Sequence, residues 1–457
     1  MYLNELKNKK ILVLGFGKEG KDNYLALRKL FPEKTFAIAD KLEFKELPKK
    51  TQKLLKQDKQ LKLHFGKNYL RSLKNYQLII KTPGISLRNI RPFLKKKTKV
   101  ISQTEIFFEY CPGKIIGVTG TKGKGTTSSL IYQILKNGKL RVHLIGNIGR
   151  PVFQALLRAK ASDIFVYEIS SHQLQTLKKS PFIAVFLNLY PDHLDYYKNF
   201  KEYCRAKESI ARYQTKKDYF IYNSEQKLLR EIAKKSKAKR IPIPTNYEFL
   251  IHPPKFCKAK FRRAGIRIPL TGKFNLQNIM AAVTVGKIFG VSDRKIIQTI
   301  ENFKPLPHRL EFVGRYKEIE FYNDSFATIP QATIAALDAL GKRVKTLILG
   351  GSSKKEIDFP LLAKKILKSK IENLILFPDT GKEIWKALRL ASLAQGKNLP
   401  KSFFVSSMAE AVKTAYQCTK KGSICLLSPA SASFSLFRNY KERGNLFKKD
   451  VKSFARS

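Results

Sequence analysis

A glycine-rich segment in the first third of the chain, from Gly117 to Thr127, most constrains the fold. It reads Gly117-Val-Thr-Gly-Thr-Lys-Gly-Lys-Gly-Thr-Thr127, between an apolar stretch at 115–118 and a helical pattern at about 126–136. Glycines let the backbone curl so that its N–H groups face phosphate oxygens, and a helix N-terminus favours an anion. Although a glycine-rich turn can arise by chance, this strand–loop–helix setting predicts a phosphate-binding loop and an ATP-using enzyme.

The residues of the loop predict how it would hold ATP and a metal ion. Lys124 can reach the β- and γ-phosphates, and a hydroxyl directly after such a lysine can bind Mg²⁺. Gly125 stands at that hydroxyl position, so the expected metal ligand moves to Thr126. The predicted ATP-binding residues of the loop are Gly120, Thr121, Lys122, Gly123, Lys124, Gly125, Thr126 and Thr127.

The rest of the chain repeats strand, turn and helix, which predicts parallel sheets covered by helices. Apolar runs predict strands at 11–14, 36–40, 77–80, 115–118, 163–168, 183–188, 346–350, 373–377 and 423–428. Proline-containing breaks lie at 91–99 and 304–307. For 457 residues we therefore predict three α/β domains. They are a Rossmann-like domain at 1–97, a central P-loop domain with a mostly parallel sheet at 98–303, and a Rossmann-like C-terminal domain at 304–457.

Composition excludes some classes of protein and leaves one question open. Apolar residues make up 43% of the chain, but none of the apolar runs approaches the ~20 residues that span a bilayer. The N-terminus lacks the apolar core of a signal peptide, and the five cysteines form no CxxC pair. We therefore expect a cytoplasmic protein. The net charge of +54 indicates either nucleic-acid binding or a lysine-rich bias spread over all solvated faces, and we favour the second explanation.

A second glycine motif lies near the N-terminus. Gly15-Phe-Gly17-Lys-Glu-Gly20 follows a predicted strand, and Asp40 follows near the end of the next one. Alone, this pattern indicates a dinucleotide-binding fold and suggests a dehydrogenase, but such motifs also bind other diphosphates. With an ATP loop in the next domain, a second nucleotide-type ligand is the more interesting interpretation.

Three further residues are candidates for metal binding or acid–base chemistry. Glu168 ends a predicted strand, which is where Mg²⁺ sits near a phosphate loop, although a structural glutamate is the alternative. His193 follows another strand with Asp192 beside it, and either a structural or a ligating role fits. Lys207, taken by itself, is one of many lysines.

Several segments together resemble the Mur ligase family over nearly the whole chain. In the central region they are the loop around Lys124, Tyr167-Glu-Ile-Ser-Ser-His-Gln-Leu174, Asp192-His193, Lys207 and the asparagine motif Leu270-Thr-Gly-Lys-Phe-Asn275-Leu-Gln-Asn278. Two more, at the start of the C-terminal region, are Leu306-Pro-His308-Arg309-Leu-Glu311 and Tyr322-Asn-Asp324-Ser325.

Two segments resemble the D-glutamate-adding branch of that family. They are Thr82-Pro-Gly84-Ile-Ser and the C-terminal run Leu426-Leu-Ser-Pro-Ala-Ser-Ala-Ser433-Phe-Ser-Leu-Phe-Arg-Asn-Tyr440-Lys-Glu-Arg-Gly-Asn-Leu-Phe447. The acidic-Asn-Pro motif of the diaminopimelate- and lysine-adding relatives is not found. Folate polyglutamylating ligases share the Gly-Lys-Gly form of the loop but lack the N-terminal glycine-motif domain and this C-terminal run. Another Mur-type or folate-type ligase, or a basic P-loop protein that binds nucleic acid, stays as an alternative.

The resemblance implies an activity. ATP would phosphorylate the carboxylate of UDP-N-acetylmuramoyl-L-alanine, and the amine of D-glutamate would displace phosphate from the acyl phosphate, in peptidoglycan precursor synthesis. Two Mg²⁺ ions are implied, one bound by Thr126 and Glu168 and one by His193. Lys207 would carry a carbamate formed with CO₂ and help to hold metal. A monomer with no membrane partner and no specific nucleic-acid partner is expected.

The resemblance also implies binding residues for each substrate. For ATP outside the loop they are Asn275 at the adenine, Asp324 at the ribose and Arg309 at the phosphates. For the UDP-sugar they are Gly17, Lys18, Glu19, Asp40, Gly84 and Asn147. For D-glutamate they are Thr328, Lys354, Ser433 and Tyr440. Four positions depart from the family pattern: Lys122 for asparagine, Gly125 at the hydroxyl position, Phe326 where some members have lysine, and no aspartate before Lys354.

Overall fold

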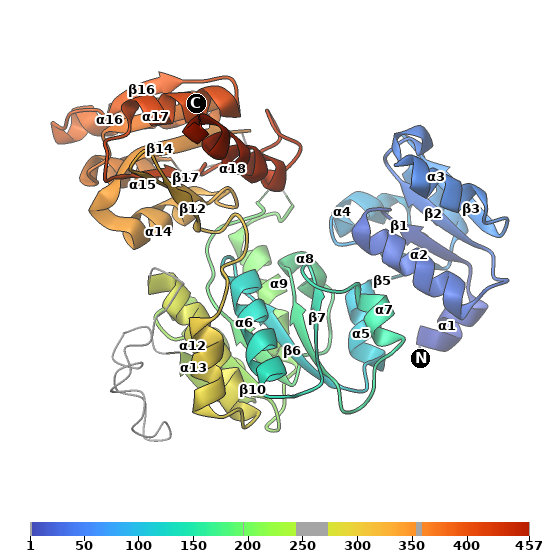
Figure 1. Ribbon diagram of the computed structural model, residues 1–457. Coiled ribbons are helices and arrows are strands. Elements are labelled where there is room, and N and C mark those ends of the chain that lie inside the picture. The colour runs from blue at the N-terminus through green and yellow to red at the C-terminus, as the bar shows by residue number, and fades with distance from the viewer. Residues whose placement is uncertain (1, 195, 244–272, 353–358, 457) are drawn as a thin grey trace. The chain divides into compact units, whose positions relative to one another are not determined.

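The computed structural model describes residues 2–194, 196–243, 273–352 and 359–456. Its contacts divide the chain into two compact units, of which the first carries two sheets and the second carries one (Figure 1). Each sheet is flanked by helices, and all but one of the strand pairs are parallel. This confirms the predicted α/β class with three sheet-bearing regions. Among the described residues, none of the helices is long and apolar enough to cross a membrane.

The first sheet has parallel strands in the order β3-β2-β1-β4-β5. Ile11 and Val13 of β1 pack on one face, and Leu12 and Leu14 on the other, so this strand is buried on both sides. Strand β5 lies beyond residue 97, so this sheet extends into the range predicted for the central domain. The elements are α1 (Tyr2–Asn8), β1 (Ile11–Leu14), α2 (Lys18–Leu30), β2 (Phe36–Asp40), η1 (Phe44–Glu46), α3 (Lys49–Lys56), β3 (Leu61–Phe65), η2 (Tyr69–Asn75), β4 (Leu78–Lys81), α4 (Leu87–Ile90), η3 (Arg91–Phe93) and β5 (Lys99–Ile101).

The second sheet, also in the first unit, has parallel strands in the order β11-β10-β9-β6-β8-β7. Strand β6 lies between β9 and β8, so the carboxyl ends of these three strands share one edge of the sheet. The elements of this region are α5 (Gln103–Tyr110), β6 (Lys114–Thr119), α6 (Lys124–Asn137), β7 (Val142–Gly146), α7 (Val152–Leu156), β8 (Ile164–Glu168), α8 (Ser171–Leu174), β9 (Ile183–Phe186), α9 (Phe200–Arg212), β10 (Tyr219–Asn223), α10 (Lys227–Lys235), β11 (Lys239–Ile243), α12 (Lys273–Ile288) and α13 (Asp293–Glu301).

The third sheet, in the second unit, has the order β12-β13-β17-β14-β15-β16. Only the pair β12–β13 is antiparallel among the described strands of this sheet. Leu347 and Leu349 of β14 pack on one face and Ile348 on the other. The elements are β12 (Glu311–Tyr316), β13 (Ile319–Asn323), α14 (Pro330–Leu340), η5 (Gly341–Arg343), β14 (Val344–Gly351), α15 (Pro360–Lys368), β15 (Asn373–Asp379), α16 (Thr380–Gln395), β16 (Lys401–Phe404), α17 (Met408–Cys418), β17 (Ile424–Leu427) and α18 (Tyr440–Arg456).

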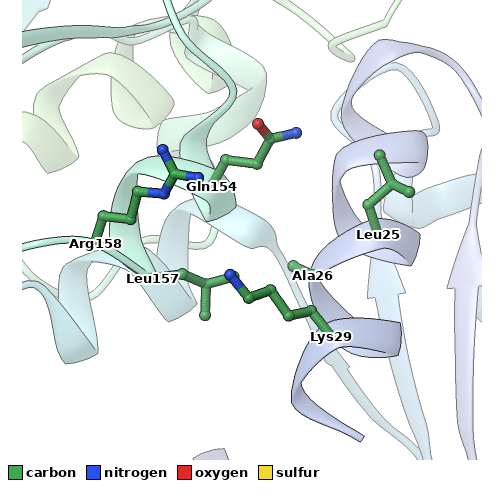
Figure 2. A pocket seen from close by; sticks show the side chains of 6 residues that line it. All are labelled: Leu25, Ala26, Lys29, Gln154, Leu157 and Arg158. Carbon is green, nitrogen blue, oxygen red and sulfur yellow. The ribbon is translucent and has the colours of Figure 1, made fainter. Parts of the chain in front are cut away.

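A pocket of about 200 Å³ lies where α2 and α7 face each other in the first unit (Figure 2). Its lining residues are Leu25, Ala26, Lys29, Gln154, Leu157 and Arg158. The two basic residues of this lining are exposed, and none of the residues predicted to bind substrate belongs to it. The pocket is therefore a feature of the helix–helix contact rather than part of the predicted site.

Candidate functional site

The phosphate loop connects β6 to α6 in the predicted strand–loop–helix setting. Gly120 and Gly123 have backbone φ angles of 153° and 85°, a region that disfavours residues with a Cβ atom. A Cβ on Gly123 would also lie 2.3 Å from Oδ1 of Asn278. Gly123 is the N-cap residue of α6, so the helix begins at Lys124, two residues earlier than the sequence predicted. The N-terminus of α6 therefore opens directly onto the loop.

Two lysines converge on the main-chain carbonyls of this loop. Nζ of Lys124 donates hydrogen bonds to O of Gly120 at 2.9 Å and to O of Thr121 at 3.0 Å. Nζ of Lys207 donates to the same Gly120 oxygen at 2.9 Å and to Oγ1 of Thr119 at 3.3 Å. Lys207 is 1% exposed, and burial, together with the nearby positive charge of Lys124, holds its pKa well below the ordinary value. The Lys207 amine is therefore poised to be neutral.

The helix α9 positions Lys207 under the loop. Its N-cap residue is Asn199, whose side chain accepts a hydrogen bond from N–H of Glu202 at 3.0 Å. Tyr203, one turn before Lys207, lies with its hydroxyl 3.0 Å from Oγ1 of Thr121. The sequence gave no reason to separate Lys207 from other lysines except the family resemblance, because its burial depends on how α9 packs.

The hydroxyl groups at the start of α6 have different surroundings. Oγ1 of Thr127 donates to Oδ1 of Asn278 on α12 at 3.1 Å, so this threonine fastens the two helices together. Thr126 is buried at the first turn, with Gly125 before it. Asn275 is buried on α12, three residues before Asn278. The hydroxyl of Thr126 thus stays the predicted metal ligand of the loop.

Glu168 lies at the carboxyl end of β8, beside the loop. Strand β8 pairs with β6, and Glu168 is the register partner of Val118. The residue is 5% exposed, and its Oε2 atom is buried without a hydrogen-bond partner among the described residues. A buried, unsatisfied carboxylate oxygen is costly unless a ligand completes it. Asn147 is exposed, and its main-chain N lies 3.5 Å from O of Glu168.

His193 follows β9 in a strained backbone conformation, with φ of 58°. Its Nε2 lies 3.8 Å from a carboxylate oxygen of Asp192, and its ring centroid is 4.7 Å from that of His172. Burial and the positive charges of His193, Lys207 and Lys81 lower the pKa of His172 to about 3. His172 is therefore neutral at physiological pH, which the sequence alone did not indicate.

The described residues contain no group of three or more His, Cys, Asp and Glu side chains arranged to hold a metal. Magnesium sites in phosphoryl-transfer enzymes use one or two carboxylates and complete the shell with water and substrate phosphates. Glu168, Thr126 and the loop fit that kind of mixed site, because a carboxylate oxygen and a hydroxyl border the place where phosphates would bind. A closed all-protein metal cage is not what these residues form.

The N-terminal glycine motif forms the turn between β1 and α2. Gly17 is the N-cap residue of α2, and both it and Lys18 are exposed. The Asp40 carboxylate accepts hydrogen bonds from the main-chain N–H groups of Phe16 at 2.5 Å and Leu42 at 2.9 Å. Asp40 therefore shapes the glycine turn itself. Gly84 is exposed in the loop after β4.

Glu19 faces the central region of the first unit. Its Oε2 accepts a hydrogen bond from Nε2 of Gln173 on α8 at 3.4 Å, and its Oε1 is buried without a partner among the described residues. Burial raises the pKa of Glu19 to about 7, although the charge of Lys81 and the bond from Gln173 oppose the change. Burial likewise lowers the pKa of Lys81 to about 8. The sequence predicted a substrate ligand here, and the structure places its carboxyl group in a buried polar network.

This network predicts how stability depends on pH. Because the folded state keeps the Glu19 proton up to about pH 7, whereas the unfolded chain loses it near the ordinary value, wild type loses stability as the pH rises through this window. The variant Glu19→Gln has no such proton to lose. Its unfolding free energy should therefore gain on wild type between pH 5 and pH 8, by about 3 kcal/mol at ~1.4 kcal/mol per pKa unit. Urea unfolding at four pH values measures this, and a difference that does not change with pH would contradict it.

The second unit brings together the predicted residues around Asp324. Oδ1 of Asp324 accepts from N–H of Leu310 at 3.1 Å, and Oδ2 accepts from Oγ of Ser428 at 2.9 Å. The Arg309 guanidinium lies 3.8 Å from the ring centroid of Phe326. The rings of Phe326 and Tyr440 are 4.7 Å apart in an edge-to-face arrangement. Phe326, where some relatives have lysine, thus packs between Arg309 and Tyr440.

The remaining predicted residues of the second unit belong to two loops. Ser433 is 3% exposed after β17, and Thr328 is half-buried just before α14. The loop after β14 pairs with the loop after β17, because N–H of Ser352 donates to O of Ala432 at 3.0 Å. Lys354, and with it the departure before it, lies outside the described residues.

Sequence reasoning missed two residues that hold these loops. Asn188 follows β9 and binds the main chain of the phosphate loop. Arg443 on α18 is fully buried and bonds to the loops at Ser325 and Ser431. Both residues stand inside segments that carried the family resemblance, but only the folded chain shows what their side chains contact.

Two family profiles match the chain: the Mur ligase middle domain at residues 118–286, and the Mur ligase glutamate ligase domain at residues 308–431. The UDP-N-acetylmuramoylalanine--D-glutamate ligase of Acetivibrio thermocellus is 33% identical over 468 residues, covering 99% of this chain and 98% of that protein. The enzyme of the same name from Clostridium botulinum is 36% identical over 464 residues, covering 98% of this chain and 97% of that protein.

The fold has the same relatives. The crystal structure of MurF ligase from Thermotoga maritima in complex with ADP matches with a TM-score of 0.58 at 16% identity, covering 98% of this chain and 97% of that one. The full-length similarity to the curated relatives, together with the two matched profiles, shows that the chain belongs to the Mur ligase family.

Proposed function

We propose that this protein is the ligase that joins D-glutamate to UDP-N-acetylmuramoyl-L-alanine, with ATP converted to ADP and phosphate, in peptidoglycan precursor synthesis. The observation that carries the proposal is the convergence of Lys124 and the buried amine of Lys207 on one carbonyl of the phosphate loop, beside the unsatisfied carboxylate of Glu168. The substrates follow from the names of relatives that match along nearly the whole chain.

The chemistry requires activation of a carboxylate. A carboxylate carbon is electron-rich and resists an amine, so its oxygen first takes the γ-phosphoryl group of ATP and ADP leaves. The amine of D-glutamate then attacks the acyl phosphate, the C–N bond forms, and phosphate departs from the tetrahedral intermediate with its electron pair. Catalysis of this kind depends on positioning and charge neutralisation. Lys124 at the N-terminus of α6 would supply a positive charge to the transferred phosphoryl group.

Magnesium and a carbamate complete the proposed site. Bound Mg²⁺ would neutralise phosphate charge, with Thr126 and Glu168 at one ion and His193 at a second. A neutral, buried lysine amine is the form that reacts with CO₂, so the low pKa of Lys207 supports a carbamate there. The product is an anion at a position where Lys124 is the nearest cation in the electrostatic surroundings of Lys207.

The other substrates are assigned to the remaining predicted residues. Asn275, Asp324 and Arg309 would hold the adenosine and phosphates of ATP, and Asn147 the UDP-sugar. Gly17, Lys18, Asp40 and Gly84 would line the uridine diphosphate site, with Glu19 supporting it from the buried side. Thr328, Lys354, Ser433 and Tyr440 would meet D-glutamate. We further propose a cytoplasmic, monomeric enzyme with no specific nucleic-acid partner.

An amino-acid panel tests the proposed function. With UDP-N-acetylmuramoyl-L-alanine, Mg²⁺ and ATP, release of ADP and formation of the ligated product should depend on D-glutamate. L-glutamate and meso-diaminopimelate should react at least about 100-fold more slowly, because a site built to pair polar groups strongly rejects an analogue that leaves them unpaired. Turnover with either of these and none with D-glutamate would show that the chain is a different ligase of this family.

A further inference from the structure

The phosphate loop is held from one side by the segment that follows β9. Strands β6 and β9 are parallel neighbours, with Thr119 paired to Phe186. The ladder continues beyond both strands: N–H of Leu187 donates to O of Thr119 at 3.0 Å, and N–H of Thr121 donates to O of Asn188 at 2.9 Å. The first residues of the loop are therefore aligned by main-chain hydrogen bonds.

The Asn188 side chain takes over where the main-chain ladder ends. Its Oδ1 accepts from N–H of Lys122 at 2.8 Å, and its Nδ2 donates to O of Lys122 at 3.0 Å. Asn188 is 5% exposed. A carboxamide carries one acceptor and one donor side by side, as a peptide group does, so both polar groups of Lys122 are satisfied by one side chain.

Fixing the main chain of Lys122 fixes the two groups around it. On one side is Thr121, whose carbonyl accepts from Nζ of Lys124 at 3.0 Å. On the other side is Gly123, whose left-handed conformation starts α6. The orientation of the Lys122 peptide groups therefore sets both the carbonyl that Lys124 contacts and the direction in which the helix N-terminus opens.

We propose that Asn188 is a positioning residue that holds the phosphate loop in its nucleotide-binding shape. It acts on the nucleotide through the main chain of Lys122 and does not itself touch the reacting atoms. The inference rests on the proposed function only in taking an adenine nucleotide as the ligand of the loop.

Direct nucleotide binding tests this role, because it needs neither D-glutamate nor the UDP-sugar. We compare wild type, Asn188→Ala and Asn188→Asp by calorimetric titration with Mg²⁺·ADP. Loss of the two hydrogen bonds should weaken ADP binding about 10-fold in Asn188→Ala. Asn188→Asp should weaken it further at pH 8, because a carboxylate cannot donate to O of Lys122. Affinity for UDP-N-acetylmuramoyl-L-alanine should stay within about 2-fold of wild type.

The pH dependence of Asn188→Asp separates positioning from general loosening. A protonated carboxyl group again has one donor and one acceptor, so the ADP affinity of this variant relative to wild type should recover as the pH falls from 8 to 6. Merely structural damage would not recover. Asn223→Ala is the matched control: this asparagine is also buried at the carboxyl end of a strand in the same sheet, and its Oδ1 accepts from N–H of Glu225 at 3.0 Å. It should bind ADP like wild type.

Two results would overturn the role of Asn188: wild-type ADP affinity in both of its variants, or an equal loss of affinity in Asn223→Ala. If Asn188→Ala does not fold, Asn188→Asp at the two pH values decides the question. A wild-type protein that binds ADP but ligates no D-glutamate would contradict the proposed function, while the loss and recovery of ADP binding in Asn188→Asp would still support the positioning role.

Discussion

Replacing Lys207 with alanine is expected to lower ligase activity at least about 1000-fold, a loss of ~4 kcal/mol in transition-state stabilisation. The Lys207 amine is buried and bonded to Gly120 and Thr119 at the base of the loop. When it attacks CO₂, an N–C bond forms and a proton leaves, which converts the only proposed cationic metal-site residue on α9 into an anion. Alanine removes this anion while leaving Lys124 in place.

The same variant offers a gain-of-function measurement. Alanine leaves room for a small anion, so acetate or formate should restore part of the activity of Lys207→Ala, whereas Lys207→Met, which fills the space, should stay inactive. Removal of bicarbonate should lower wild-type activity, and ¹³C-labelled bicarbonate should give a carbamate signal that is missing in both variants. Lys201→Ala removes an exposed lysine of the same helix and serves as the control. Full activity of Lys207→Ala would disprove the role of the carbamate.

The sequence predicted those parts of the fold that local pattern determines. The strands at 11–14 and 36–40 have the predicted bounds, because each is a continuous apolar run that is buried on both faces. Strand β9 ends at Phe186, short of the predicted residue 188, because Asn188 leaves the strand to bind the loop. The hairpin of β12 and β13 was not predicted, since these strands are partly exposed and carry polar residues between the apolar ones.

The candidate site divides in the same way. A loop that joins a strand to a helix announces itself in consecutive residues, so the surroundings of Lys124 could be predicted without any relative. The contacts that give other residues their chemical character join segments far apart in sequence: Gln173 with Glu19, Asn188 with Lys122, and Lys207 with Gly120. No periodicity encodes these pairs. The family resemblance pointed to several of the residues, and the folded chain supplies the neighbours that explain their burial and pKa shifts.

Replacing Arg443 with methionine is expected to destabilise the C-terminal unit by about 3 kcal/mol or more, because each buried acceptor left unpaired costs ~1–3 kcal/mol. The Arg443 side chain is fully buried. Nε donates to Oγ of Ser325 at 3.1 Å and Nη2 to O of Ser325 at 2.9 Å, while Nη1 and Nη2 donate to O of Ala432 at 3.2 Å and O of Ser431 at 3.1 Å. One guanidinium therefore ties the loop that carries Asp324 to the loop that carries Ser433.

Loss of this tie should also affect catalysis, because the two loops hold the proposed contacts to the ribose of ATP and to D-glutamate. We expect the KM for D-glutamate to rise at least about 10-fold in Arg443→Met, and also in Arg443→Lys, since an ammonium lacks the planar fork that spans both loops. Thermal unfolding and initial rates against D-glutamate measure the two effects. Arg438→Met, which removes an exposed arginine five residues earlier that pairs with Glu442 at 3.8 Å, should change neither. If Arg443→Met unfolds and turns over like Arg438→Met, the guanidinium does not organise these loops, and their shape must come from the main-chain pairing of Ser352 with Ala432.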